Sequence, residues 1–211
     1  MRKVKFINGG FYHIFNRGTD KRTIFADNYD FERFLQGMRE FNSLKPIGSI
    51  YENSFRNQLR FPTPKLVNIV AYCLNPNHFH LILEQTKNGG ISEYLKKIGG
   101  GYANYFNAKY KRSGTLFQGR FKSIYIDSNT YLLHLSAYVN LNNKVHKIKD
   151  QKFRSSWAEY IGDSNTRLCN PKIILDQFKN QKEYRDFAES SLLDMLQRKE
   201  MRKEMESLLL E

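Results

Sequence analysis

Apolar residues gather in four short stretches rich in aromatic and β-branched side chains, and recur at three- and four-residue steps in four longer stretches. The short stretches predict strands at 11–17, 66–74, 78–84 and 121–126. The longer ones predict helices at 27–43, 89–110, 131–141 and 181–210. This order, β-α-β-β-α-β followed by further helix, indicates an α+β fold: a ferredoxin-like antiparallel sheet with helices on one face. The other face would then be free for a site.

Breaks in the pattern suggest how the chain is divided. Residues 44–64 carry three prolines and little periodicity, so we interpret them as an insertion loop. Three consecutive glycines at 99–101 interrupt a helical pattern, which predicts a kink or a close approach of another helix. We expect a main domain over 1–150 and a mostly helical C-terminal extension over 151–211.

The charge balance restricts the partners. Thirty-four Lys and Arg against 21 Asp and Glu give a formal net charge of +13, which favours a polyanion such as nucleic acid. No apolar run is long enough to span a bilayer, and residues 1–10 lack the apolar stretch of a signal peptide. Two cysteines, Cys73 and Cys169, do not suggest a disulfide framework. We therefore expect a cytoplasmic protein without a membrane partner.

Two histidines share one face of the strand predicted at 78–84. Successive side chains in a strand point to opposite faces, so His78 and His80 lie together while Phe79 and Leu81 face the core. Two neighbouring imidazoles can bind a metal, but an isolated pair is more often two polar residues on a solvated face. A third ligand is needed to favour the metal site.

The helix predicted at 131–141 offers that ligand. His134, Tyr138 and Asn142 are spaced four residues apart and so lie along one side of it. Two imidazoles and the Asn142 amide form a mixed nitrogen and oxygen set, which suits Mg²⁺ or Mn²⁺ better than a structural zinc. Tyr138, one turn earlier, would then lie near a bound phosphate as a nucleophile. Most of the 13 tyrosines must simply pack, and Tyr125 and Tyr131 are alternative nucleophiles.

Aromatic and cationic residues are interleaved over 102–106, 110–112 and 117–122, a mixture that stacks bases and neutralises phosphates. The candidate DNA contacts are Arg17, Arg112, Arg120 and Lys122. The glycine-rich stretches lack the Gly-Lys-Ser/Thr sequence of a phosphate-binding loop, so we expect no nucleotide cofactor.

Four segments, at 12–18, 71–84, 114–133 and 155–162, together resemble the bacterial single-tyrosine transposases of the HUH superfamily, especially REP-associated tyrosine transposases. The resemblance covers about residues 10–162. It implies His78, His80 and Asn142 as ligands of a divalent metal and Tyr138 as the nucleophile. It also implies binding of single-stranded DNA with hairpin or palindromic structure, and cleavage of one strand to leave a 5′-phosphotyrosine and a free 3′-hydroxyl. Such an enzyme would work at the nucleoid of a bacterial cytoplasm.

The chain departs from that family at a few positions. Asn143 and Lys144 replace a usual Pro-Val, Ala137 replaces a frequent arginine, and the 44–64 insertion is unusual. The resemblance leaves open whether the protein mobilises an element or serves its host, and whether it is a monomer or a homodimer. Two other interpretations remain: a noncatalytic hairpin-binding protein, and an RNA-binding domain that stacks bases on its sheet.

Overall fold

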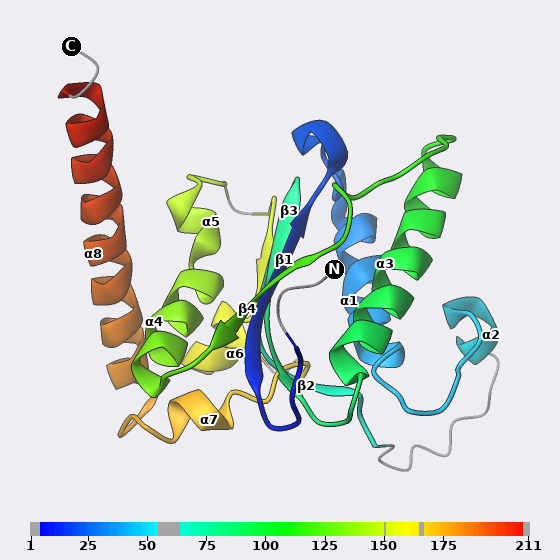
Figure 1. The fold of residues 1–211 in the computed structure, drawn as a ribbon, viewed down its shortest axis with the longest axis horizontal. Coiled ribbons are helices and arrows are strands. Elements are labelled where there is room, and N and C mark those ends of the chain that lie inside the picture. Colours follow the sequence, from blue (N-terminus) through cyan, green and yellow to red (C-terminus); the bar gives the residue numbers. More distant parts are fainter. Residues whose placement is uncertain (1–4, 55–63, 150, 165–166, 209–211) are drawn as a thin grey trace.

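The computed structural model describes residues 5–54, 64–149, 151–164 and 167–208 (Figure 1). Its strands are β1 (Phe11–Arg17), β2 (Val67–Asn75), β3 (His78–Gln85), β4 (Lys122–Ile126) and β5 (Arg154–Ser155). Its longer helices are α1 (Asn28–Glu40), α3 (Gly90–Lys109), α4 (Asn129–Asn140) and α8 (Gln181–Leu208). The short ones are α2 (Ile50–Ser54), α5 (Asn142–Val145), α6 (Trp157–Ile161), α7 (Lys172–Leu175) and a 3₁₀ turn at Thr19–Lys21. No helix within these ranges has the length and apolar character needed to cross a bilayer.

The strands form one antiparallel sheet in the order β4-β1-β3-β2-β5. The first four strands have the ferredoxin-like order, so the predicted α+β fold is confirmed. The pairing of β1 with β3 sets Phe15 opposite His80 and Arg17 opposite His78. The two-residue strand β5, which the hydrophobic pattern does not predict, extends the sheet beyond β2.

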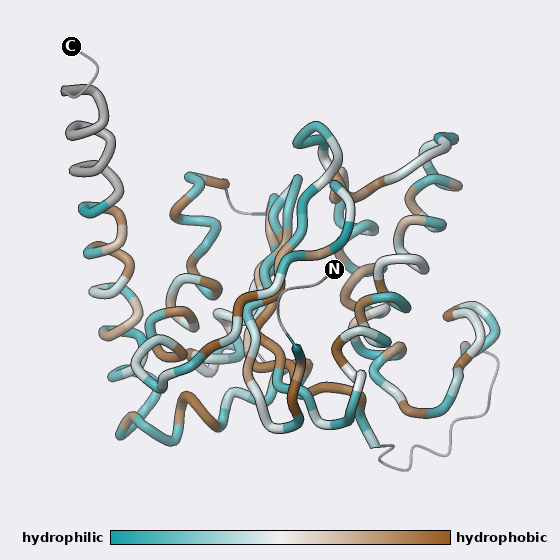
Figure 2. Tube along the Cα trace, in the orientation of Figure 1, coloured by the Kyte–Doolittle hydropathy of each residue, from teal (hydrophilic) through white to brown (hydrophobic). Residues whose placement is uncertain are grey.

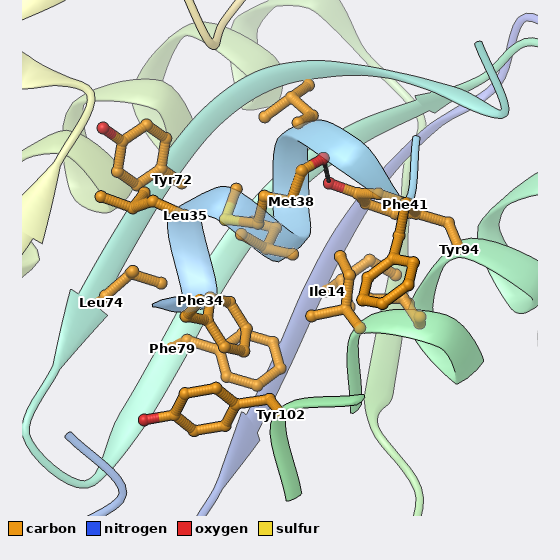
Figure 3. Close-up of a cluster of buried hydrophobic side chains, with 14 of the residues drawn as sticks. Ile14, Phe34, Leu35, Met38, Phe41, Tyr72, Leu74, Phe79, Tyr94 and Tyr102 are labelled. Atoms are coloured by element: carbon orange, nitrogen blue, oxygen red, sulfur yellow. Dashed lines mark hydrogen bonds between the residues drawn. The ribbon is translucent and has the colours of Figure 1, made fainter. Parts of the chain in front are cut away.

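Helices α1 and α3 cover one face of the sheet, and the side chains between them form the first core (Figures 1 and 3). Asp27 begins α1 through a capping box, in which it accepts a hydrogen bond from the Asp30 amide and the Asp30 carboxylate accepts one in return. The Tyr94 hydroxyl of α3 donates to the Met38 carbonyl of α1 at 2.9 Å. This layer is therefore fixed by both apolar packing and buried hydrogen bonds.

The glycine run lies inside one continuous helix, α3. A Cβ added to Gly101 would lie 2.9 Å from the Phe41 ring, so a close approach does occur there, whereas Gly99 and Gly100 face open space. Of the predicted 44–64 insertion, part forms α2, and residues 55–63 lie outside the described residues.

The second face of the sheet is also packed, although the strand and helix order alone left it free for a site. Helix α4 packs against β2, β3 and β4 on the side opposite α1 and α3, and α8 packs on α4 from outside (Figure 1). The reason lies in β2, where Val70, Ala71 and Cys73 are buried beside Ile82 of β3, so the strand needs cover on both faces. Figure 2 shows hydrophobic stretches within the strands and on both flanking layers, whereas the turn after β1 is hydrophilic.

The segment after residue 150 contributes to this second core. Tyr160 of α6 and Tyr184 of α8 are fully buried and belong to the same core as residues of β2, β3 and α4. Ser156 connects the segment to the sheet, because its hydroxyl accepts a hydrogen bond from the Tyr72 amide at 2.9 Å. The described part of the segment after residue 150 therefore packs against α4, the helix that carries Tyr138.

Candidate functional site

The two histidines of β3 line a cavity of about 590 Å³ at one end of the sheet. His78 is half-buried and His80 is 8% exposed, while Phe79 between them packs into the first core, as the strand alternation predicts. Phe15 and Arg17 of β1 line the same cavity because they are the strand partners of the two histidines. The sheet register thus brings an aromatic ring and a cation beside the imidazoles.

Helix α4 brings Tyr138 to this cavity. Ser128 caps the helix by accepting a hydrogen bond from the Tyr131 amide, and Ala137 and Val139 are fully buried in the second core. With its two neighbours held in the core, the Tyr138 ring lies 5.6 Å from the His80 ring, centroid to centroid, in an edge-on arrangement. Burial raises the pKa of the Tyr138 phenol, and the neighbouring Asn142 side chain opposes that rise.

Asn142 lies just beyond the end of α4. The helix ends at Asn140, and after Leu141 (φ −108°) the short helix α5 begins at Asn142. The Asn142 side chain is fully buried, and its Oδ1 lies 3.2 Å from the His78 Nε2. The Asn75 amide donates to both atoms, at 2.6 Å to Asn142 Oδ1 and 2.9 Å to His78 Nε2. The Asn142 Nδ2 has no hydrogen-bond partner among the described residues.

Each histidine of the pair is held through its Nδ1 atom. The Asn77 Oδ1 lies 2.7 Å from the His78 Nδ1, and the His13 Nε2 lies 2.9 Å from the His80 Nδ1. Burial lowers the pKa of His78 to about 4, and the nearby Asn142 side chain, which favours the charged imidazole, has a smaller opposing effect. Burial, followed by the neighbouring His13, lowers the pKa of His80 well below its usual value. Both imidazoles are therefore neutral at neutral pH and can offer a lone pair at Nε2.

The donor set fits a small divalent cation. Two adjacent ligands of an octahedral ion, each about 2.1 Å from it, lie roughly 3 Å apart. The 3.2 Å separation of His78 Nε2 and Asn142 Oδ1 matches this spacing, and Asn75 already places its amide hydrogens against both lone pairs. Across the described ranges, no group of three His, Cys, Asp or Glu side chains is arranged to hold a metal. The fit therefore rests on two histidines together with an amide.

The predicted DNA contacts do not all meet at this cavity. Arg17 and Lys122 line it, and Arg17 donates to the Gln118 side chain. Arg120 lies in a neighbouring pocket. Arg112, just after the end of α3, donates to the Asn107 side chain at 2.8 Å and lies over the Phe106 ring.

Three further residues of the site are not apparent from the sequence pattern. Lys21 lines the cavity from the turn after β1, and the His146 ring lies 4.7 Å from the His78 ring. His13 contacts His80 directly, and its place beside Phe15 in the alternation of β1 was the available signal. His134, which shares a helical side with Tyr138 in the sequence pattern, instead bonds to Ser191 of α8 at 2.8 Å.

Comparison with known proteins finds one matching family model and similar solved structures. The family model for "Transposase IS200 like" matches residues 60–142, a stretch that begins before the histidine pair and ends at Asn142. A solved REP-associated tyrosine transposase bound to a REP hairpin is similar to 81% of this chain and 93% of its own, with a TM-score of 0.52 at 14% identity. A "putative transposase" from Deinococcus radiodurans R1 covers 70% of this chain and 98% of its own, with a TM-score of 0.39 at 14% identity. Comparison with curated proteins finds no match.

The fold is similar to that of the REP-associated tyrosine transposase, and residues 60–142 are similar to IS200-like transposases. The resemblance to IS200-like transposases, predicted from the ordered motifs, is confirmed by the family match over residues 60–142.

Proposed function

We propose that this protein is a metal-dependent single-stranded DNA endonuclease and strand transferase, which acts on DNA hairpins through a covalent 5′-phosphotyrosine. The observation that carries the proposal is that Tyr138 and the His78 and His80 imidazoles line one cavity, with the buried Asn142 amide in contact with His78. These side chains come from β3, α4 and α5, so the packing of two separate elements against the sheet builds the site.

The charge of the cavity suits a phosphodiester. Arg17, Lys21 and Lys122 line it, and all three side chains are exposed to solvent. Cations in this position neutralise phosphates on either side of the cleaved bond and give binding a strong dependence on salt. The REP-associated transposase of similar fold was solved with a REP hairpin, which supports a hairpin as substrate here.

In the proposed reaction, the Tyr138 oxygen attacks phosphorus and the bond from phosphorus to the 3′-oxygen breaks. The phenolic proton passes to solvent in the cavity, and the departing 3′-oxygen takes up a proton to become a free hydroxyl. Attack by a 3′-hydroxyl on the phosphotyrosine reverses these changes and joins two strands. The covalent ester keeps the energy of the broken bond, so rejoining needs no nucleotide cofactor.

His78, His80 and Asn142 would hold the cation, Mg²⁺ or Mn²⁺. When bound, it polarises the scissile phosphate and stabilises charge that develops on its oxygens. The chain's own part is to keep both imidazoles neutral and oriented, through Asn77 on His78 and His13 on His80.

The test is cleavage of a labelled DNA hairpin with single-stranded flanks, in the presence of Mg²⁺ or Mn²⁺. We expect a covalent adduct that survives denaturation and maps to Tyr138. The Tyr138→Phe variant should form no adduct yet bind the hairpin with nearly unchanged affinity, because it loses only the hydroxyl. The matched control is Tyr131→Phe, two turns earlier on the same helix, which should cleave normally.

An adduct on Tyr131 or Tyr125 would refute the assignment of the nucleophile. Hairpin binding without any cleavage would favour the noncatalytic interpretation. Tighter binding to a matched RNA hairpin, again without metal-dependent nicking, would favour the RNA-binding one.

A further inference from the structure

A second pocket, of about 230 Å³, lies on the α3 side of the sheet. It is next to the cavity lined by His78, His80 and Tyr138, which we call the catalytic cavity. Phe117 and Phe121 form aromatic walls, and Lys96 and Arg120 stand at its exposed rim. Neither of these cations forms a salt bridge with another described residue. The pocket therefore combines ring faces with positive charge that the protein itself does not neutralise.

The segment between α3 and β4 joins this pocket to the catalytic cavity. Gln118 lines the catalytic cavity, while the next residues, Gly119 and Arg120, line the second pocket. The Gln118 amide donates to the Arg17 carbonyl at 2.8 Å, and the Asn16 side chain donates to the Gly119 carbonyl at 3.2 Å. These bonds fix the segment to the end of β1, so a strand that passes over it reaches both cavities.

The glycines of α3 form the remaining wall. Gly99 and Gly100 both line the pocket, and no atom lies within 4 Å of a Cβ placed on either residue. Both positions lie inside a regular helix, where glycine is the least favourable residue after proline. The absence of side chains here leaves room for a flat group between the helix and the two phenylalanines.

We propose that this pocket binds one unpaired nucleobase of the single-stranded DNA that flanks the bond cut at Tyr138. The inference rests on the proposed function and adds to it a place where base identity can be sensed. A nucleobase has the flat apolar faces that stack on phenylalanine, and its phosphates complement Lys96 and Arg120. An apolar peptide or lipid would leave those two cations without a counter-charge.

The experiment fills the pocket without removing any existing contact. Gly99→Leu and Gly100→Leu place a side chain in the open space and raise helix propensity, so both variants should melt at or above the wild-type temperature. The probe is a DNA hairpin with single-stranded flanks in which 2-aminopurine replaces one base at a time. Ala108→Leu places the same leucine side chain at an exposed position of the same helix and is the control.

We expect the wild-type protein and Ala108→Leu to change the fluorescence at one flanking position. Gly99→Leu and Gly100→Leu should lose that change and bind the flanked hairpin about tenfold more weakly, in line with the loss of one stacked base. A blunt hairpin without flanks should bind all four proteins equally. Arg120→Gln, on the exposed rim, should also weaken binding of the flanked hairpin.

Wild-type fluorescence and affinity in both glycine variants would overturn the pocket assignment while leaving the proposed function intact. If a glycine variant melts below wild type, Arg120→Gln decides instead, and unchanged affinity for the flanked hairpin overturns the assignment. A wild-type protein that neither binds nor cleaves DNA would refute the proposed function and this inference with it.

Discussion

Tyr184 anchors the helix that carries Tyr138, and its hydroxyl can be removed without changing the packing of its ring. The hydroxyl accepts a hydrogen bond from Asn140 Nδ2 at 2.9 Å and lies 3.1 Å from the Ser136 hydroxyl, both on α4. The Asn140 Oδ1 in turn accepts from Ser156. All four side chains are buried, so α8, α4 and the segment before α6 share one polar network. Tyr184→Phe removes its central oxygen.

The expected loss of stability in Tyr184→Phe follows from the polar group that is left without a hydrogen-bond partner. Ser136 keeps its bond to the Leu133 carbonyl, but Asn140 Nδ2 loses its hydrogen-bond acceptor inside the core. A buried donor left unsatisfied costs about 1–3 kcal/mol. We expect the free energy of unfolding to fall by about 2 kcal/mol, which lowers the melting temperature of a chain of this size by about 4–8 °C. Calorimetry and urea titration both measure this change.

Tyr160→Phe is the matched control, since it removes a buried hydroxyl that donates to the Val70 carbonyl at 2.9 Å and does not bond to α4. It should cost about 1 kcal/mol. At a temperature well below both transitions, Tyr184→Phe should slow cleavage because α4 loses an anchor, whereas Tyr160→Phe should cleave as wild type. Equal effects of the two variants on stability and cleavage would refute the anchoring role of Tyr184.

Three further predictions follow from the site. A mixture of the Tyr138→Phe and His80→Ala proteins should not cleave the DNA hairpin in a gel assay, because one chain supplies both side chains to the site. Restored cleavage would show that the site is shared between two subunits. His13→Ala should weaken Mn²⁺ binding in calorimetry by about 10–100-fold, with His134→Ala as an unaffected control. Burial lowers the pKa of His13 from 6.5 to about 4, so in urea titrations the metal-free protein should be fully stable above about pH 6.5 and lose at least about 3 kcal/mol as pH falls to 4, because His78 and His80, whose pKa values are also lowered, add to the loss; a flat profile would contradict this.

The long elements of the fold could be predicted from the sequence because each has a local cause. β1 and β3 are short runs rich in aromatic and aliphatic residues, and α1 has its Asp27 cap. The ends of both strands and of α4 fall within two residues of their predicted positions. The two-residue strand β5 has no pattern of its own and exists because Ser155 pairs with Cys73 of β2. Such an element depends on tertiary contact and cannot be predicted from a local window.

The same distinction applies to the site. The two histidines of β3 follow from strand alternation, and Tyr138 from its helical spacing to Asn142. The partner of His80 cannot be predicted in this way. Its contact with His13 depends on the register between β1 and β3, and the two histidines are 67 residues apart in the sequence. The bonds from the Asn75 amide to His78 and Asn142 likewise depend on the geometry of the β2–β3 hairpin and of the turn from α4 into α5. Spacing along the sequence predicts which residues of one helix or strand lie on the same side. Contacts between different elements can be predicted only once the fold is known.

Burial makes Tyr138 a weaker nucleophile, and the groups around the cavity can compensate for this. A phenol with a raised pKa is mostly protonated at neutral pH and is a poor nucleophile without positive charge nearby. The exposed cations Arg17 and Lys122 reach the cavity from β1 and β4, and the neutral His78 and His80 offer lone pairs to a divalent ion. In the proposed reaction Tyr138 therefore becomes reactive only when the DNA and the divalent cation are both bound. Cleavage is then restricted to the complex of protein, DNA and cation.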